Sequence, residues 1–340
     1  MERINEIAGR TALVLETNNL RGGDRQLAAA EASLRHVMGV LASQTVPLSA
    51  LAQVVITHDG LSAACRDSLT QAAGCRIDFV EISADTGYYD AKNTGFAATD
   101  PARCAYVLFA DADCRPDSGW LAAMLAPFAQ PSPPAVVAGR TSYADNVVGS
   151  ALTTMDFMYF PSRLAAGATR NFYANNVAFR RDVFARYQYQ PLEGVYRAHC
   201  QVLGMRLHAA GLPLHYAAAA HTEHRLPDTW RETLQLRWMR GEDTHALTPH
   251  LVLTLLPSWL QWLARSGPVG PLCVQLARLG CSVRALNRQD LTRLRGLRWL
   301  GGMAAIGLFS AVDMAGALFY SLGLRTAHGA QETTLSYHRR

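Results

Sequence analysis

Four short apolar runs, separated by helical patterns, dominate the chain between residues 11 and 128. The apolar runs cover residues 11–16, 52–57, 76–82 and 105–110. The helical patterns cover residues 25–42, 62–73, 89–98 and 118–128. Short buried strands that alternate with helices build βαβ units and a parallel sheet. The alternation therefore predicts an α/β fold, in which a mostly parallel central sheet is flanked by helices.

Polar residues gather where these predicted strands end. The segments at 16–19 and 57–62 follow the first and second strands, and the fourth strand runs into 111–113. The helix after the third strand carries the polar segment 90–95. Ligands of open α/β sheets bind beyond the carboxyl ends of the strands. We therefore expect these four segments to line one crevice.

Asp111 and Asp113 stand one residue apart at the end of an apolar run. Residues i and i+2 of a strand point to the same side, and two carboxylates this close repel unless a cation lies between them. Carboxylate oxygens together with substrate phosphates are typical ligands of Mg²⁺ and Mn²⁺. The pair predicts a divalent metal site, and the alternative is a solvated turn held by Asx hydrogen bonds.

The order of these motifs resembles that of family 2 glycosyltransferases of the GT-A fold, over residues 10–245. The matching segments are ETNN (16–19), HDGLS (58–62), DAKNTGFAAT (90–99), LFADADCRPDSGWL (108–121), NNVAFRRDVF (175–184) and LGMRLHAAGLPLHYAAAAHTEH (203–224). The resemblance implies a Rossmann-like sheet and an enzyme that moves a sugar from a nucleotide-diphosphate sugar to a hydroxyl acceptor. It also implies Mn²⁺ or Mg²⁺ as cofactor and inversion at the anomeric carbon.

The resemblance also assigns roles around the metal. Asp113 would bind the ion directly, and Asp111 would reach the ribose or the metal. His224 matches the histidine that follows the last core strand in the family, and neutral imidazole suits Mn²⁺ as a third ligand. His221 is an alternative ligand.

Other positions match the donor-binding residues of the family. Asp59 would accept a hydrogen bond from the nucleobase, although a turn aspartate before glycine is the alternative. Glu16 and Thr17 would lie near base and ribose, with Glu16 in place of the usual proline. Lys92 would counter phosphate charge, and Asn93 would face the crevice beside it.

Two arginines on a later helical segment resemble the acceptor side of the family. Arg237 and Arg240 lie on this segment, and planar guanidinium groups suit a diphosphate or an anionic acceptor. The family sometimes has QxxRW here, and this chain is one residue short of that motif. We therefore do not predict a polysaccharide synthase.

The usual catalytic base is missing from the sequence. In the family it belongs to an ED pair placed seven and six positions before the arginine that corresponds to Arg206, and here those positions hold His199 and Cys200. Three explanations stay open. His199 could be the base, since its ordinary pKa suits proton transfer at neutral pH, or Glu193 could take that role. Otherwise another group acts as base or none does, and the alternative to an enzyme is a catalytically silent domain that binds a sugar nucleotide or a membrane partner.

The end of the chain has a different character. Residues 299–324 carry a single charge, at Asp313, and are long enough to span a bilayer. A spanning helix or hairpin, interfacial helices and a soluble packed helix are the alternatives. Residues 250–265 are aromatic-rich and amphipathic, which favours a membrane-facing region. We expect a glycosyltransferase domain at 1–245 and a helical, membrane-associated region at 246–340.

Charge and cysteine content limit the partners and the location. The net charge of +5 suits anionic small molecules or anionic lipid, and is too small to indicate nucleic acid. The seven cysteines form no CxxC pair, which predicts reduced thiols. These features favour the cytoplasmic side of a membrane, near a lipid-linked or amphiphilic acceptor.

Overall fold

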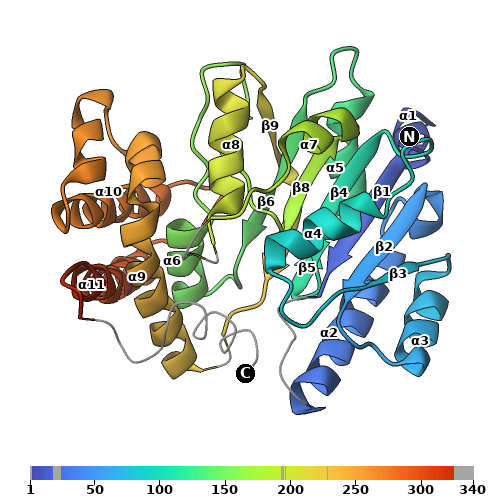
Figure 1. Cartoon of the computed structure of the whole chain (residues 1–340), viewed down its shortest axis with the longest axis horizontal. Coiled ribbons are helices and arrows are strands. Elements are labelled where there is room, and N and C mark those ends of the chain that lie inside the picture. Colours follow the sequence, from blue (N-terminus) through green and yellow to red (C-terminus); the bar gives the residue numbers. More distant parts are fainter. Residues whose placement is uncertain (1, 18–23, 193–194, 196, 228, 325–340) are drawn as a thin grey trace.

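The computed structural model of the chain describes residues 2–17, 24–192, 195, 197–227 and 229–324 (Figure 1). Within these residues a nine-stranded sheet forms the centre of the fold. Its strands are β1 (Thr11–Glu16), β2 (Gln53–His58), β3 (Asp78–Glu81), β4 (Tyr106–Asp111), β5 (Cys114–Pro116), β6 (Val136–Ser142), β7 (Ala168–Thr169), β8 (Asn176–Arg180) and β9 (Leu214–His224). The four predicted strands correspond to β1–β4, with ends displaced by at most two residues.

The sheet is mostly parallel, with some antiparallel pairs. Its strand order is β3-β2-β1-β4-β8-β6-β9-β5, and β7 pairs with β9. Neighbouring strands from β3 to β4 pair in parallel, β8 runs against both β4 and β6, and β6 and β9 are parallel again. β5 and β7 each run against β9. The α/β fold class predicted from the sequence is confirmed.

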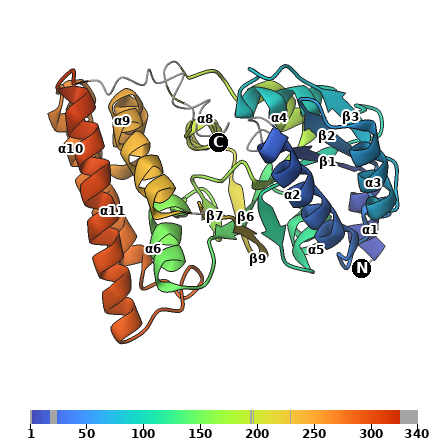
Figure 2. The same ribbon diagram turned by 90° about the horizontal axis from the view of Figure 1, so that it is seen from below.

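Helices cover both faces of the sheet (Figure 2). They are α1 (Glu2–Ala8), α2 (Asp24–Ala42), α3 (Ala63–Ala73), α4 (Tyr88–Ala97), α5 (Trp120–Leu125), α6 (Val147–Asp156), α7 (Arg181–Tyr187), α8 (His199–Ala209), α9 (Trp230–Leu255), α10 (Val269–Ala285) and α11 (Leu297–Ser321), with 3₁₀ turns η2 (Leu48–Ala50), η3 (Ala126–Ala129) and η4 (Ser258–Arg265). Side chains of a strand alternate between faces. Leu13 and Leu15 therefore pack with α1, α2, α3 and α5, whereas Val14 packs with α4, α7 and α8.

Helix α4 lies unusually close to the strands beneath it. A Cβ added at Gly95 would come within 2.5 Å of Val14 Cγ1 and 3.0 Å of Thr57 Cγ2. Any larger residue would push the helix away from β1 and β2. The glycine of the 90–99 motif thus brings the preceding turn of α4, with Tyr88 and Lys92, toward the strand ends.

The C-terminal helices pack against one another and against α6. Helix α9 begins with a capping box, in which Thr229 and Glu232 bond to each other's backbone N–H groups. Gly241 of α9 and Gly316 of α11 allow close contact, because an added Cβ would lie 2.2 Å from the Asp313 carbonyl and 2.4 Å from the Trp238 carbonyl, respectively. Because α9 continues to Leu255, the predicted boundary at residue 245 falls inside a helix.

Helix α11 is, among the described residues, the one helix long and apolar enough to cross a membrane. Its single acid, Asp313, is 1% exposed and pairs with Arg237 of α9. One face of α11 is therefore fixed to the fold by an ion pair and a close glycine contact. The opposite face is apolar and exposed, and includes Leu297, Leu300 and Leu308.

Candidate active site

The polar ends of the parallel strands meet as the sequence predicted. In the sheet register, Glu16 of β1 lies between Thr57 of β2 and Asp111 of β4. The backbone N–H of Ala112 donates to the Glu16 carbonyl over 3.1 Å, which holds the turn after β4 against β1. Glu16 itself is fully buried. These contacts place the acidic pair at the mouth of the central sheet.

Asp111 is buried in what we call the strand-tip cluster, formed with Tyr88 and Lys92. Lys92 Nζ lies 2.5 Å from Asp111 Oδ1, and the Tyr88 hydroxyl donates to Asp111 Oδ2 over 2.6 Å. Lys92 is 0% exposed and lies 4.8 Å from the centre of the Tyr88 ring. Burial and the nearby Asp111 carboxylate raise the pKa of Tyr88 well above its usual value, so that its hydroxyl stays a donor. Lys92 therefore neutralises Asp111, and its predicted contact with phosphate stays a prediction.

Asp113 differs from Asp111, since its carboxylate is partly exposed and faces a histidine. Asp113 Oδ2 lies 3.5 Å from His224 Nε2, and the Cys114 thiol is 3.8 Å from Asp113 Oδ1. Strand β5 brings these residues together, because Cys114 stands opposite His224 in the antiparallel β5–β9 pair. Burial raises the pKa of Asp113, the neighbouring His224 lowers it, and the Asp111 charge raises it further.

The hydrogen bond of His224 fixes its tautomer. His224 Nδ1 lies 2.8 Å from the Arg225 carbonyl, which can only accept, so Nδ1 carries the proton. Nε2 therefore faces Asp113 and is the ring nitrogen that a metal ion could bind. Both ring nitrogens of the alternative ligand, His221, are already bonded, to Asp117 and Ser142. The geometry favours His224.

The residues present fit a divalent cation. One ligand atom each from Asp113, Cys114 and His224 lie within 4.8 Å of one another, the one such group found in the described part of the chain. Burial and the two aspartates raise the pKa of the Cys114 thiol well above its usual value, and a protonated thiol is a poor ligand. A carboxylate oxygen and an imidazole nitrogen remain, which suit Mn²⁺.

The predicted nucleobase side is shaped by His58. Its Nδ1 accepts from the backbone N–H groups of Gly60 and Leu61, each over 3.3 Å, and this builds the turn that carries Asp59. Asp59 is half-buried at that turn. The Thr17 hydroxyl donates to the Thr57 carbonyl over 2.6 Å and is buried. Thr17 thus joins β1 to β2, and a role of Thr17 or Asp59 in base binding stays a prediction.

Two predicted ligand-binding residues have structural partners instead. Asn93 donates from Nδ2 to the Tyr189 carbonyl over 2.9 Å and accepts from the Tyr189 N–H over 3.3 Å, so its amide is used to hold the segment after α7. Arg237 is 1% exposed and donates to both oxygens of Asp313 and to Asp156. These contacts engage hydrogen-bonding groups of Asn93 and Arg237 inside the fold and argue against a donor or acceptor contact, and the two roles stay predictions.

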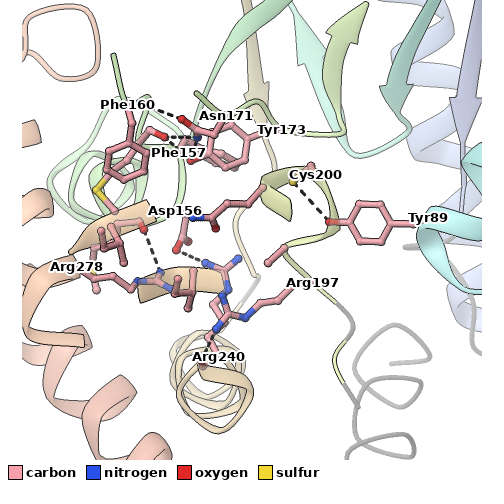
Figure 3. Close-up of a pocket in the computed structure, with 16 residues that line it drawn as sticks. Tyr89, Asp156, Phe157, Phe160, Asn171, Tyr173, Arg197, Cys200, Arg240 and Arg278 are labelled. Atoms are coloured by element: carbon pink, nitrogen blue, oxygen red, sulfur yellow. Dashed lines mark hydrogen bonds and ion pairs between the residues drawn. The ribbon is translucent and has the colours of Figure 1, made fainter. Parts of the chain in front are cut away.

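Arg240 keeps more freedom than Arg237. It pairs with Asp156, and its side chain is 18% exposed. It also lines a cavity of about 170 Å³ bordered by residues of α4, α6, α8, α9 and α10 (Figure 3). Its prediction as a ligand for an anion therefore stays open. We call Arg237, Arg240, Asp156 and Asp313 the helix cluster.

The predicted base, His199, is the first residue of α8. It is 9% exposed and stacks on Tyr89 with ring centres 4.1 Å apart. Burial lowers the pKa of His199 to about 4, while the Arg197 backbone acts in the opposite direction. His199 is therefore neutral at pH 7 and able to accept a proton, but it is a weak base. Glu193 lies outside the described residues. Burial raises the pKa of Cys200, which argues against a thiolate nucleophile there.

Comparison with known proteins supplies the family. Residues 33–188 match the model of the family described as glycosyl transferase family 2. The chain carries a family 2 glycosyltransferase domain. Asp59, Lys92, Asp111 and Asp113 lie within the matched range, whereas His224 lies beyond it. A search of the curated proteins found no match.

One solved structure with a TM-score above 0.5 supports the same fold, and two others superpose less well. A mannosyltransferase from Pyrobaculum calidifontis, in complex with GDP-Man and Mn²⁺, superposes with a TM-score of 0.54 at 16% identity, covering 92% of this chain and 86% of that chain. TarS of S. aureus gives 0.47 at 14% identity, covering 93% and 55%, and GalNAc-T7 with UDP, GalNAc and Mn²⁺ gives 0.45 at 13% identity, covering 65% and 45%. The family match and this fold identify the enzyme class as glycosyltransferase.

Sequence reasoning missed three participants. Tyr88, which donates to Asp111, lies two residues before the start of the recognised 90–99 segment. Cys114 follows the acidic pair and was visible as its neighbour. Asp156 pairs with Arg237 and Arg240 from α6, and no local signal marks it, because its partners are 81 residues or more away.

Proposed function

We propose that this family 2 glycosyltransferase uses a nucleotide-diphosphate sugar and a divalent metal, Mn²⁺ or Mg²⁺. The observation that carries the proposal is the position of Asp113 Oδ2 3.5 Å from His224 Nε2, beside an Asp111 that is paired with Lys92. Neighbouring structures in the same fold were solved with Mn²⁺ and with GDP-Man or UDP. When bound, such an ion relieves the negative charge of a departing diphosphate.

The chain's own residues would prepare the donor site. Asp113 and His224 would hold the cation. Lys92 would hold Asp111 in place and offset its negative charge. Asp59, on the turn built by His58, would contact the nucleobase. The acceptor hydroxyl would attack the anomeric carbon with inversion, as the family resemblance implies. His199, neutral at pH 7, would accept the proton of that hydroxyl.

We also propose that the C-terminal helices rest on the cytoplasmic face of a membrane. Trp259 and Trp262 of η4 are 73% and 64% exposed, as suits an interfacial anchor. Arg293, Arg295 and Arg298 are exposed around the start of α11, where they would meet anionic headgroups. Because α11 is tied to the fold through Asp313, we propose peripheral binding without a membrane span.

The decisive experiment measures Mn²⁺-dependent hydrolysis and transfer with a panel of nucleotide-diphosphate sugars. We expect activity with at least one donor, and a loss of about 100-fold or more in Asp113→Ala, because a metal ligand is removed. Asp182→Ala is the matched control, since Asp182 is an exposed aspartate paired with Arg180. Equal activity of the wild type and Asp113→Ala would overturn the proposed metal site.

A silent binding domain is the second candidate. It is favoured by His199 and Cys200 at the positions of the usual ED pair, and by the low basicity of the buried His199. The same panel separates the two candidates. If calorimetry shows Mn²⁺-dependent nucleotide binding but no donor is hydrolysed or transferred, the silent domain is the better description.

A further inference from the structure

The cavity bordered by α4, α6, α8, α9 and α10 has two different walls. One wall is apolar and includes Phe157, Phe160, Leu251 and Leu255. The other carries Arg197, Arg240 and Arg278, which come from the segment before α8, from α9 and from α10, respectively. Figure 3 shows these three arginines gathered near Asp156, with Tyr89 and Cys200 on the other side of the view.

The arginines are not equally neutralised. Arg197 pairs with Asp243 over 3.1 Å, and Arg240 pairs with Asp156. Arg278 donates to the Met155 carbonyl over 3.3 Å, and no carboxylate of the described residues lies within ion-pair distance of it. Burial and the like charge of Arg197 lower the pKa of Arg278 to about 10. A half-buried cation beside other cations favours the binding of an anion.

The cavity adjoins the donor site on two sides. Tyr89 lines it, stacks on His199, and packs edge-on against Tyr88 with ring centres 4.7 Å apart. Phe157 also lines it, and its ring centre lies 5.8 Å from that of His224. A molecule in the cavity would therefore be separated by one side chain each from Tyr88, the partner of Asp111, and from His224, the proposed metal ligand. An acceptor needs this position, whereas a purely structural cavity does not.

The apolar wall is continuous with the turn η4. Leu251 and Leu255 of α9 line the cavity and belong to an apolar cluster that also includes Leu260 and Leu263 of η4. The 3₁₀ turn η4, which follows α9, exposes Trp259 and Trp262. An apolar chain could thus continue from the cavity to the surface that we propose faces the membrane.

We propose that this cavity binds the acceptor, and that the acceptor is an anionic amphiphile whose phosphate-like group contacts Arg278 while its apolar chain lies along Leu251 and Leu255. The inference rests on the proposed function, since it names the acceptor class of the same enzyme. A phosphate-like group on a lipid and a free phosphate share the chemistry that Arg278 would recognise. The apolar wall argues for the former.

The test is a calorimetric titration of the full chain with dodecyl phosphate below its micellar concentration, without metal or donor. We expect saturable binding that weakens about tenfold or more in Arg278→Met, because a charge-assisted contact is lost. Arg284→Met is the matched control, since Arg284 is an exposed arginine on the same helix. Arg278→Lys should lose less affinity than Arg278→Met, because it keeps the charge.

Two comparison ligands, dodecyl maltoside and inorganic phosphate, test the charged contact and the apolar contact separately. Dodecyl maltoside binding as tightly as dodecyl phosphate would overturn the anionic contact. Inorganic phosphate binding as tightly would overturn the role of the apolar wall. If Arg278→Met does not fold, the wild-type affinity for dodecyl phosphate at rising NaCl gives the answer, since a charge contact weakens with salt and an apolar contact does not.

The experiments distinguish a failure of the proposed amphiphile site from a failure of the proposed enzyme activity. Asp113→Ala should bind dodecyl phosphate as the wild type does, because Asp113 does not line the cavity. If the wild-type chain binds dodecyl phosphate through Arg278 but hydrolyses no donor, the amphiphile site is supported and the proposed enzyme activity is contradicted. The reverse result, donor hydrolysis without amphiphile binding, would remove only the acceptor inference.

Discussion

The strand-tip cluster and the helix cluster both bury a cation against aspartate, but their surroundings differ. In the strand-tip cluster, Lys92 and Tyr88 hold Asp111, and the partly exposed Asp113 stands next to it. In the helix cluster, Arg237 is enclosed by Asp313 and Asp156. A neutralised cluster beside a partly exposed carboxylate suits a ligand site. A cluster whose central arginine is fully enclosed holds helices together.

The largest effect should come from removing Arg237, the buried cation of the helix cluster. Arg237→Met leaves Asp313 without its buried partner and weakens the pairing of Asp156, so we expect a loss of about 4 kcal/mol in the free energy of unfolding. Urea unfolding measures it. Arg180→Met, in an exposed pair with Asp182, should cost less than about 1 kcal/mol. Similar losses in both variants would mean that the helix cluster is not structural.

The second prediction separates the two aspartates of the strand-tip region. Asp111→Asn leaves Lys92 buried without a charged partner, so we expect a loss of about 3 kcal/mol in stability together with a loss of activity. Asp113→Asn should abolish metal-dependent hydrolysis while changing stability by less than about 1 kcal/mol, because its side chain is 13% exposed. Urea unfolding and Mn²⁺ titration measure both. Equal stability losses would remove the distinction between a structural and a ligand-binding aspartate.

The strand-tip region was the more predictable of the two from sequence. Strands β1–β4 are local apolar runs, and in a parallel sheet their carboxyl ends meet at one edge, so the convergence of Glu16, Thr57 and Asp111 follows from pattern alone. Which side chain neutralises which does not follow from it. That Lys92 faces Asp111 rather than a phosphate depends on how closely α4 packs, which Gly95 sets.

The helix cluster was not predictable from local pattern. Arg237 and Asp313 are 76 residues apart, and local sequence indicates an anion-binding arginine at one position and a single charge in an apolar segment at the other. Their pairing explains both residues at once. It depends on the close α9–α11 crossing at Gly241 and Gly316, which no local pattern reveals.

His199 lies between the two regions and gives a prediction in pH. Burial lowers the pKa of His199 from an ordinary 6.5 to about 4 in the folded chain. As the pH falls, the unfolded chain therefore takes up this proton at a higher pH than the folded chain does. The folded state is therefore destabilised as the pH falls from about 6.5 toward 4, and the stability is fully present above that range. Between pH 7 and pH 5 we expect this residue to account for about 2 kcal/mol.

The measurement is urea unfolding of the wild type and His199→Gln at pH 7 and pH 5. The variant should lose about 2 kcal/mol less than the wild type between the two values, because glutamine does not titrate. His36→Gln, at an exposed histidine on α2, is the control. An equal pH dependence in all three proteins would show that His199 is not buried in neutral form beside the cavity, and would weaken its assignment as base.

The smallest expected effect concerns the outer surface of the C-terminal helices. Substitutions there should change membrane binding and leave the free energy of unfolding almost unchanged. Trp259→Ser combined with Trp262→Ser should lower partitioning onto vesicles containing phosphatidylglycerol by about tenfold, because two interfacial anchors are removed. Stability should hardly change, since both side chains are mostly exposed. Leu164→Ser, at an exposed apolar residue outside these helices, should leave partitioning unchanged. If the double variant sediments with vesicles as the wild type does, the buried helix cluster organises a packed domain with no lipid-facing surface at η4.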